Sequence, residues 1–129
     1  MNYLLDTHTL IWFLENNPIL PDIVRNNIRN PKNNVFVSMI SLWEIIIKIN
    51  IEKLKLHFDF DELFDAIETF SYEILPLKKE HLRVYLPLPL THRDPFDRLL
   101  ISIAKCENLK IITKDEKIRN YDVEWVWDK

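Results

Sequence analysis

The sequence predicts an α/β fold in which a mostly parallel sheet of about five strands is covered by helices on both faces. Short apolar runs alternate along the chain with longer segments whose apolar residues recur at helical spacing. Unbroken apolar runs are typical of parallel strands, which are buried on both faces. No linker, repeat or low-complexity tract divides the 129 residues. We therefore expect residues 1–129 to form a single domain.

The short apolar segments are expected to form the strands, because they are bounded by turn-forming residues and most are rich in β-branched or aromatic residues. In chain order they are residues 3–5, 35–37, 72–75, 110–113 and 123–127. The turn at residues 30–34, where Pro31 lies among asparagines, marks the start of the second strand.

The longer segments between the strands are expected to form helices. They are residues 10–14, 21–30, 60–70, 79–86 and 95–107, with a further helix that ends at about residue 51. Thr7 or Thr9 is expected to cap the first helix. Ser38 or Ser41 is expected to cap the helix that ends near residue 51, and Ser41 with Glu44 matches the capping-box pattern.

The segment of residues 91–101 carries the clearest chemical signal. Asp94 has the chemistry of a helix N-cap, and Pro95 suits the first helical position, where the missing N–H costs nothing. Asp97 follows three residues after Asp94, so the two carboxyl groups are neighbours at the start of the helix. Acidic residues in a first turn also complement the helix dipole, so this motif alone is weak evidence for a site.

Three further acidic residues lie at the ends of expected elements, and together they predict a metal site. Asp6 and Asp115 follow strands, whereas Glu44 and Asp97 lie in first turns of helices. Ligands bind beyond the carboxyl ends of parallel strands, so these four carboxylates are expected around one crevice, with Asp94 as a candidate fifth ligand. Clustered carboxylates repel one another without a cation, and their hard oxygen atoms suit Mg²⁺ or Mn²⁺. Such ions activate water in phosphodiester cleavage.

Composition excludes several other classes of protein. Glycine is absent, so no Gly-rich phosphate loop exists. The net charge of −3 argues against binding nucleic acid by bulk positive charge. A single cysteine excludes an internal disulfide framework, and the histidines show no paired spacing for zinc. No apolar run reaches the roughly 18–20 residues that span a bilayer, so we expect a soluble cytoplasmic protein with no membrane partner.

Four motifs, at residues 5–12, 41–45, 93–100 and 112–115, together resemble the successive motifs of PIN-domain proteins. They are most similar to VapC-type toxins of type II toxin–antitoxin systems. The resemblance implies a three-layer α/β/α fold and an endoribonuclease that depends on Mg²⁺ or Mn²⁺. It places Asp6, Glu44, Asp97 and Asp115 at the acidic positions of the family. It also implies a homodimer and a cognate antitoxin whose tail occupies the active-site groove.

Two other interpretations remain open from the sequence. A receiver-like, phosphoryl-accepting domain also gathers acids and a lysine, here Lys114, but it needs two adjacent acids after the first strand, where only Asp6 stands. A non-catalytic PIN-like module would bind RNA or protein without needing the acids. Arg93 and Arg98, which flank the acids, are expected either to contact phosphate or to pair with the nearby carboxylates.

Overall fold

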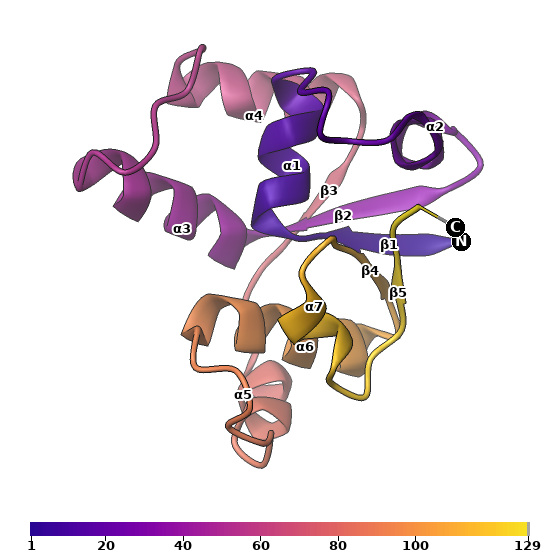
Figure 1. Ribbon diagram of the computed structural model, residues 1–129, viewed down its shortest axis with the longest axis vertical. Helices are drawn as coiled ribbons and strands as arrows, with labels where there is room; N and C mark the ends of the chain where they lie inside the picture. Colours follow the sequence, from indigo (N-terminus) through magenta and orange to yellow (C-terminus); the bar gives the residue numbers. More distant parts are fainter. Residues whose placement is uncertain (129) are drawn as a thin grey trace.

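The computed structural model describes residues 1–128, and its centre is a five-stranded sheet (Figure 1). The strands are β1 (Asn2–Leu5), β2 (Asn34–Ser38), β3 (Glu73–Leu75), β4 (Lys110–Ile112) and β5 (Trp125–Val126). They lie in the order β3-β2-β1-β4-β5, and every neighbouring pair is parallel. The chain moves outward from β1 to β3 and then crosses back to β4. The strand order therefore reverses between β1 and β4, which is where open α/β sheets bind ligands.

Seven helices connect the strands and cover both faces of the sheet in the described part of the chain. They are α1 (Thr7–Leu14), α2 (Asp22–Arg29), α3 (Met39–Asn50), α4 (Phe60–Thr69), α5 (Lys79–Tyr85), α6 (Pro95–Glu107) and α7 (Glu116–Arg119). In Figure 1, α1 to α4 lie on one side of the sheet, and α5 to α7 lie on the other. The predicted three-layer α/β/α architecture with a parallel sheet is confirmed.

Two hydrophobic cores hold these layers together, one on each face of the sheet. Leu5, Val37 and Ile112 point toward α1 to α4 and pack with the buried residues of those helices. Leu4 and Ile111, their neighbours along the strands, point the other way and pack against α6 and α7. Because successive strand residues face opposite sides, a strand covered on both faces must be apolar throughout. The unbroken apolar runs have this origin.

Two capping predictions need correction. Thr7 and Thr9 lie within α1, and Asp6 is its N-cap, with Oδ1 accepting a hydrogen bond from the Thr9 backbone N–H at 2.7 Å. Of the two serines expected to cap α3, Ser38 is the N-cap. The capping box expected for Ser41 and Glu44 therefore does not form. Ser41 lies inside the helix, where its buried hydroxyl has no hydrogen-bond partner among the described residues. The carboxyl of Glu44 is thereby available for contacts outside its own helix.

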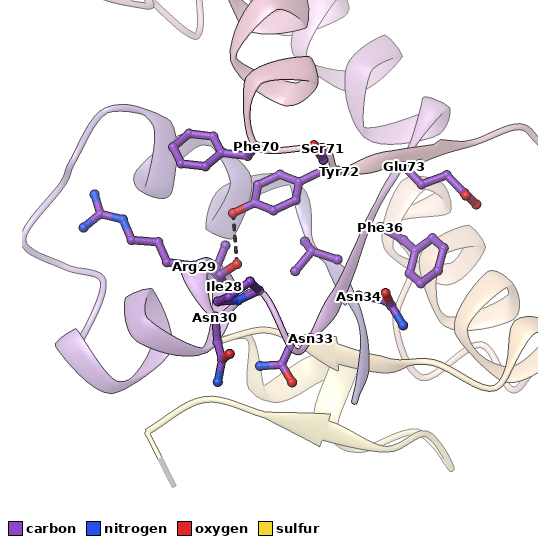
Figure 2. Close-up of a pocket in the computed structure, with 12 residues that line it drawn as sticks. Ile28, Arg29, Asn30, Asn33, Asn34, Phe36, Phe70, Ser71, Tyr72 and Glu73 are labelled. Carbon is purple, nitrogen blue, oxygen red and sulfur yellow. Dashed lines mark hydrogen bonds between the residues drawn. The ribbon is translucent and has the colours of Figure 1, made fainter.

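At the amino edge of the sheet lies a cavity of about 400 Å³, formed by the end of α2, the following turn and the starts of β2 and β3 (Figure 2). Tyr72 lies in the wall of this cavity, and burial raises its pKa to about 12. The hydroxyl therefore stays protonated, and it donates a hydrogen bond to the Ile28 carbonyl at 3.0 Å. Glu73 is the one carboxylate among the residues that line this cavity. The clustered acids lie at the opposite, carboxyl edge.

None of the helices in residues 1–128 has the length and apolar character needed to cross a bilayer.

Candidate active site

Asp6 lies directly beyond the carboxyl end of β1, at the reversal of strand order. Asp6 is 4% exposed, and its backbone N–H continues the pairing of β1 with β4 by donating to the Ile112 carbonyl at 3.3 Å. The cap contact with the Thr9 N–H uses only Oδ1. Burial raises the pKa of the Asp6 carboxyl, and neighbouring Thr113 and Thr9 oppose this rise. A carboxylate here is therefore costly for the fold unless a cation accompanies it.

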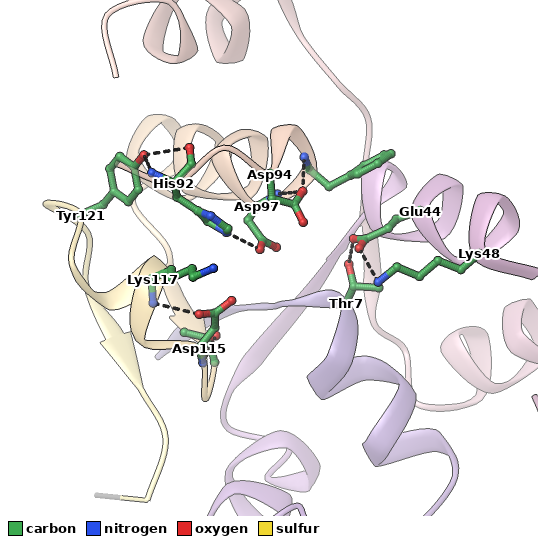
Figure 3. Close-up of polar contacts among 11 residues, drawn as sticks. Thr7, Glu44, Lys48, His92, Asp94, Asp97, Asp115, Lys117 and Tyr121 are labelled. Carbon is green, nitrogen blue, oxygen red and sulfur yellow. Dashed lines mark hydrogen bonds and ion pairs between the residues drawn. The ribbon is translucent and has the colours of Figure 1, made fainter. Parts of the chain in front are cut away.

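Glu44 extends from α3 toward the start of α1 (Figure 3). It is 3% exposed, and both of its carboxylate oxygen atoms have partners. Oε1 accepts a hydrogen bond from the Thr7 hydroxyl at 2.6 Å, and Oε2 forms an ion pair with Lys48 Nζ at 2.9 Å, one helical turn away. The tertiary contact with Thr7 joins two segments that are 37 residues apart in the sequence. Glu44 is consequently held in one orientation at the edge of the sheet.

Asp97 lies in the first turn of α6, and its electrostatic environment connects the acids. Its Oδ2 is 2.8 Å from His92 Nε2. Its pKa is raised to about 7, principally by burial; the His92 hydrogen bond opposes this rise, and the charges of Asp94, Glu44 and Asp6 add to it. Asp97 therefore lies within electrostatic reach of three other carboxylates from three different segments. The structure thus brings Asp6, Glu44 and Asp97 near Asp94, the candidate fifth ligand, whereas Asp115, the fourth acid expected here, is not among the charges that act on Asp97.

Asp94 and Asp115 each cap a helix with one oxygen. Asp94 Oδ1 accepts from the N–H groups of Phe96 at 2.9 Å and Asp97 at 3.3 Å, which confirms its predicted capping role. Asp115 Oδ1 accepts from the Lys117 N–H at 2.8 Å. Both side chains are only partly buried. In both, the cap contacts are made by Oδ1, and Oδ2 has no part in them.

The surface around these acids is hollowed in two places. Asp6 and Asp115 line a cavity of about 280 Å³ together with Trp12 and Lys114. Glu44 and Asp94 line a groove of about 490 Å³, which also contains the side chains of Ile47, Lys48, Ile51, Lys53, Arg93, Pro95 and Phe96. Figure 3 shows Asp94 and Asp97 at the start of α6, with Glu44 from α3 and Asp115 from the start of α7 around the same region. All five predicted acids thus lie along the same edge of the sheet.

Sequence reasoning missed His92 and misjudged Arg98. His92, Asp94 and Asp97 form a group of potential metal-ligand atoms that all lie within 4.8 Å of one another. Arg98 takes neither of the two expected roles. Its guanidinium stacks on Tyr85 at 4.4 Å and donates to the Tyr85 hydroxyl and to the Leu88 carbonyl, away from the acids. Arg93 is exposed and lines the groove beside Glu44.

The donor chemistry of this site fits a divalent metal ion. Asp6, Glu44 and Asp97 offer hard carboxylate oxygen atoms, which are the ligands that Mg²⁺ and Mn²⁺ prefer. Lys48 and His92 are the basic side chains that contact these three acids in the described part of the chain. Burial is the main cause of the raised pKa of Asp97, and the charges of Asp94, Glu44 and Asp6 add to the rise. A bound cation would remove that excess of negative charge.

Comparison with known proteins assigns the family. The model of the PIN domain matches residues 3–124. The chain belongs to the PIN-domain family. No curated protein matches the sequence significantly.

Three solved structures have a similar fold. The fold is similar to a chain in the crystal structure of VapBC2 from Rickettsia felis bound to a DNA fragment from their promoter, with a TM-score of 0.71 and 22% identity over 99% of this chain and 100% of that chain. It is also similar to VapBC-1 from nontypeable Haemophilus influenzae, with a TM-score of 0.63 and 19% identity over 98% of this chain and 97% of that chain. FitAcB from Neisseria gonorrhoeae matches with a TM-score of 0.64 and 19% identity over 95% of both chains. At these identities the structural likeness establishes the fold.

Proposed function

We propose that this PIN-domain protein is an endoribonuclease dependent on Mg²⁺ or Mn²⁺, and that it is the VapC-type toxin of a toxin–antitoxin pair. The observation that carries the proposal is the gathering of Asp6, Glu44 and Asp97 at the reversal of strand order, where burial raises the pKa of Asp97 to about 7 and the charges of Asp94, Glu44 and Asp6 add to the rise. Membership of the PIN-domain family and the fold shared with VapBC and FitAcB structures support it.

Asp6, Glu44, Asp97 and Asp115 would hold the metal, with Asp94 as the candidate fifth ligand; Asp115 lines the same cavity as Asp6. When bound, the ion supplies a Lewis acid and lowers the pKa of water, which is the chemistry that phosphodiester hydrolysis needs. The chain itself contributes preorganisation. The Thr9 N–H holds Asp6, and the Thr7 hydroxyl holds Glu44, so neither buried carboxylate needs to reorient when the reaction begins.

Local cations support RNA as the substrate although the chain is acidic overall. Lys48, Lys53 and Arg93 line the groove that contains Glu44 and Asp94, and Lys114 lines the cavity that contains Asp6. Cations at these places would contact the phosphates on either side of the scissile bond and position the strand. A single strand lying along the groove would present its backbone to the acids. Binding would then depend on this local arrangement and fall with added salt.

The same groove supports an antitoxin as the protein partner. Ile47, Ile51 and Phe96 give it an apolar floor, and Trp43, which is 54% exposed, packs edge-on against Phe96 with a ring separation of 5.3 Å. Exposed apolar surface beside a charged site is characteristic of a protein-binding face. A peptide segment bound here would cover Glu44 and Asp94 and block the site. We further propose that the protein acts in the cytoplasm and forms a homodimer, as the family resemblance implies.

RNA cleavage by the purified protein tests this proposal. We expect a mixed single-stranded RNA pool to be cleaved with Mg²⁺ or Mn²⁺ and to remain intact with chelator. Asp6→Asn and Asp97→Asn remove ligand charge while keeping the side-chain shape, so each should nearly abolish cleavage. Asp65→Asn, which changes an exposed acid on α4, is the matched control and should cleave normally.

Full activity in either site variant would contradict the assignment of the metal site. RNA binding without cleavage at any metal concentration would instead favour the non-catalytic PIN-like module. Incorporation of phosphate from a small phosphodonor would favour the receiver-like alternative.

A further inference from the structure

His92 is a buried residue whose two sequence neighbours are exposed. It lies in the segment that precedes α6, and it is 8% exposed, whereas its neighbours Thr91 and Arg93 are exposed. The imidazole is directed at Asp97, with Nε2 at 2.8 Å from Oδ2 (Figure 3). The loop therefore places one particular side chain against one particular carboxylate oxygen.

The backbone around His92 is fixed by Tyr121, from the turn after α7. The His92 N–H donates to the Tyr121 hydroxyl at 3.0 Å, and that hydroxyl donates in turn to the Pro89 carbonyl at 2.5 Å. Tyr121 is itself buried. The Tyr121 hydroxyl thus links the loop at Pro89 and at His92 to the segment that follows α7. This arrangement restrains the imidazole as well as the carboxylate that it contacts.

The hydrogen bond determines which atoms of the pair remain available. An ionised carboxylate only accepts hydrogen bonds, so His92 must carry a proton on Nε2 when Asp97 is charged. Asp97 Oδ2 is then occupied by the imidazole, while Oδ1 has no hydrogen bond within residues 1–128. In many metal sites a carboxylate orients a histidine ligand in this way. In this site the roles are exchanged: the carboxylate of Asp97 is the expected ligand, and His92 orients it.

We propose that His92 is a positioning residue that holds Asp97 through Nε2–H so that its other oxygen is directed to the metal. The inference rests on the proposed function, because it takes Asp97 as a metal ligand. It assigns His92 no direct contact with metal or RNA. The expected consequence is that His92 sets metal affinity through a hydrogen-bond donor, and that any side chain placing a donor at the same point will serve.

The chain offers a matched control in His81. This residue is also buried, at 0% exposure, and its Nε2 lies 3.1 Å from Glu107 Oε2. Its ring is likewise fixed from the other side, since Nδ1 accepts a hydrogen bond from the Lys78 N–H. Glu107 is at the opposite end of α6 from Asp97, about 15 Å away at a rise of 1.5 Å per residue. His81 thus forms the same kind of pair outside the acidic site.

The test measures Mn²⁺ affinity by calorimetric titration, without RNA, for wild type, His92→Ala, His92→Gln and His81→Ala. Loss of such an orienting partner typically weakens metal binding about 10–100-fold, which is the loss expected for His92→Ala. His92→Gln keeps an N–H donor and should recover most of that affinity. His81→Ala should lower the melting temperature but leave the Mn²⁺ affinity unchanged.

A second measurement needs no variant at the site. At pH 8 or above, where Asp97 is ionised, a nitrogen-15 histidine spectrum of the metal-free wild-type protein should show the His92 proton on Nε2. Tyr121→Phe, which removes the hydroxyl but leaves the imidazole, should weaken Mn²⁺ binding less than His92→Ala does. These readouts keep the inference testable if His92→Ala does not fold.

Several results would overturn the inference. Wild-type affinity in His92→Ala would show that Asp97 needs no positioning, and an equal loss in His81→Ala would show general loosening. If His92→Gln binds as weakly as His92→Ala, the imidazole acts as a ligand and not as a positioning group. Absence of Mn²⁺ binding by the wild type would overturn both this inference and the metal site. Mn²⁺ binding without RNA cleavage would overturn only the nuclease.

Discussion

The charge of Asp97 should destabilise the metal-free protein, and Asp97→Asn should relieve this effect. The pKa of the carboxyl is raised from 3.8 to about 7, chiefly by burial, with the charges of Asp94, Glu44 and Asp6 adding to the rise. Each pKa unit corresponds to about 1.4 kcal/mol, so the whole shift corresponds to about 4 kcal/mol. The side chain is 15% exposed, and solvent screening reduces this value. We expect a gain of roughly 1–3 kcal/mol in Asp97→Asn at neutral pH.

The pH dependence gives this prediction its sign. At pH below 3.8 the carboxyl is protonated in both the folded and the unfolded chain, and it carries no penalty. Between 3.8 and about 7 the unfolded chain loses the proton while the folded protein keeps it, so the free energy of unfolding falls as the pH rises. Above about 7 both states are ionised and the penalty is constant. The advantage of Asp97→Asn should therefore be absent near pH 3 and complete near pH 8.

Urea denaturation in the presence of chelator, at several pH values, measures the difference directly. Asp65→Asn is the control, because this exposed acid should change stability little at any pH. The Asn side chain keeps an oxygen that can accept from His92, so loss of that hydrogen bond does not complicate the comparison. A variant that is less stable than wild type at pH 8, or whose advantage does not vary with pH, would refute the reasoning. Added Mn²⁺ should reverse the order by stabilising wild type more.

Three further predictions concern the neighbouring residues. Asp94→Asn should be tolerated because asparagine caps about as well, whereas Asp94→Ala should lower the free energy of unfolding by about 0.5–2 kcal/mol. Denaturant midpoints and cleavage rates measure both variants. If Asp94→Asn is as inactive as Asp97→Asn, Asp94 is a ligand. Millimolar Mn²⁺ should raise the melting temperature of wild type but not of the Asp6→Asn/Asp97→Asn double variant, and an equal rise in both would place the metal elsewhere. Tyr121→Phe should cost about 1–3 kcal/mol in urea denaturation, because the buried His92 N–H loses its acceptor; an unchanged midpoint would show that another group replaces the hydroxyl.

The layers of the fold could be predicted because burial leaves a direct mark on the sequence. The central strands β1, β2 and β4 are covered on both faces, so most of their residues are apolar in succession, and the helices between the strands carry apolar residues on one face. The ends of elements were less predictable. β5 was expected over residues 123–127, whereas the structure pairs only Trp125–Val126. Edge strands have one neighbour, so fewer of their residues need to be apolar or paired.

The errors at the site arise where a tertiary contact decides between local alternatives. Ser38 and Ser41 both offer a cap, and only the contact between Thr7 and Glu44 shows that Glu44 faces another helix. His92 and Asp97 are five residues apart across the boundary of a loop and a helix. That separation has no helical or strand periodicity, so pattern reasoning gave no signal for the pair. The side chain of Arg98, on α6, is likewise directed by Tyr85, from another segment.

Capping and metal binding are not alternatives at this site. Asp6 caps a helix with Oδ1 and leaves Oδ2 outside that contact, as Asp94 and Asp115 do. A carboxylate that caps a helix can therefore also bind a metal ion, since the backbone N–H holds one oxygen atom and the other stays available. Burial distinguishes the three. A cap needs no burial, and burial raises the pKa of Asp6 although hydrogen bonds from Thr113 and Thr9 oppose the rise. The same cost does not fall on the partly exposed Asp94 and Asp115. We infer that the need for a bound cation is greatest at Asp6 and smaller at Asp94 and Asp115.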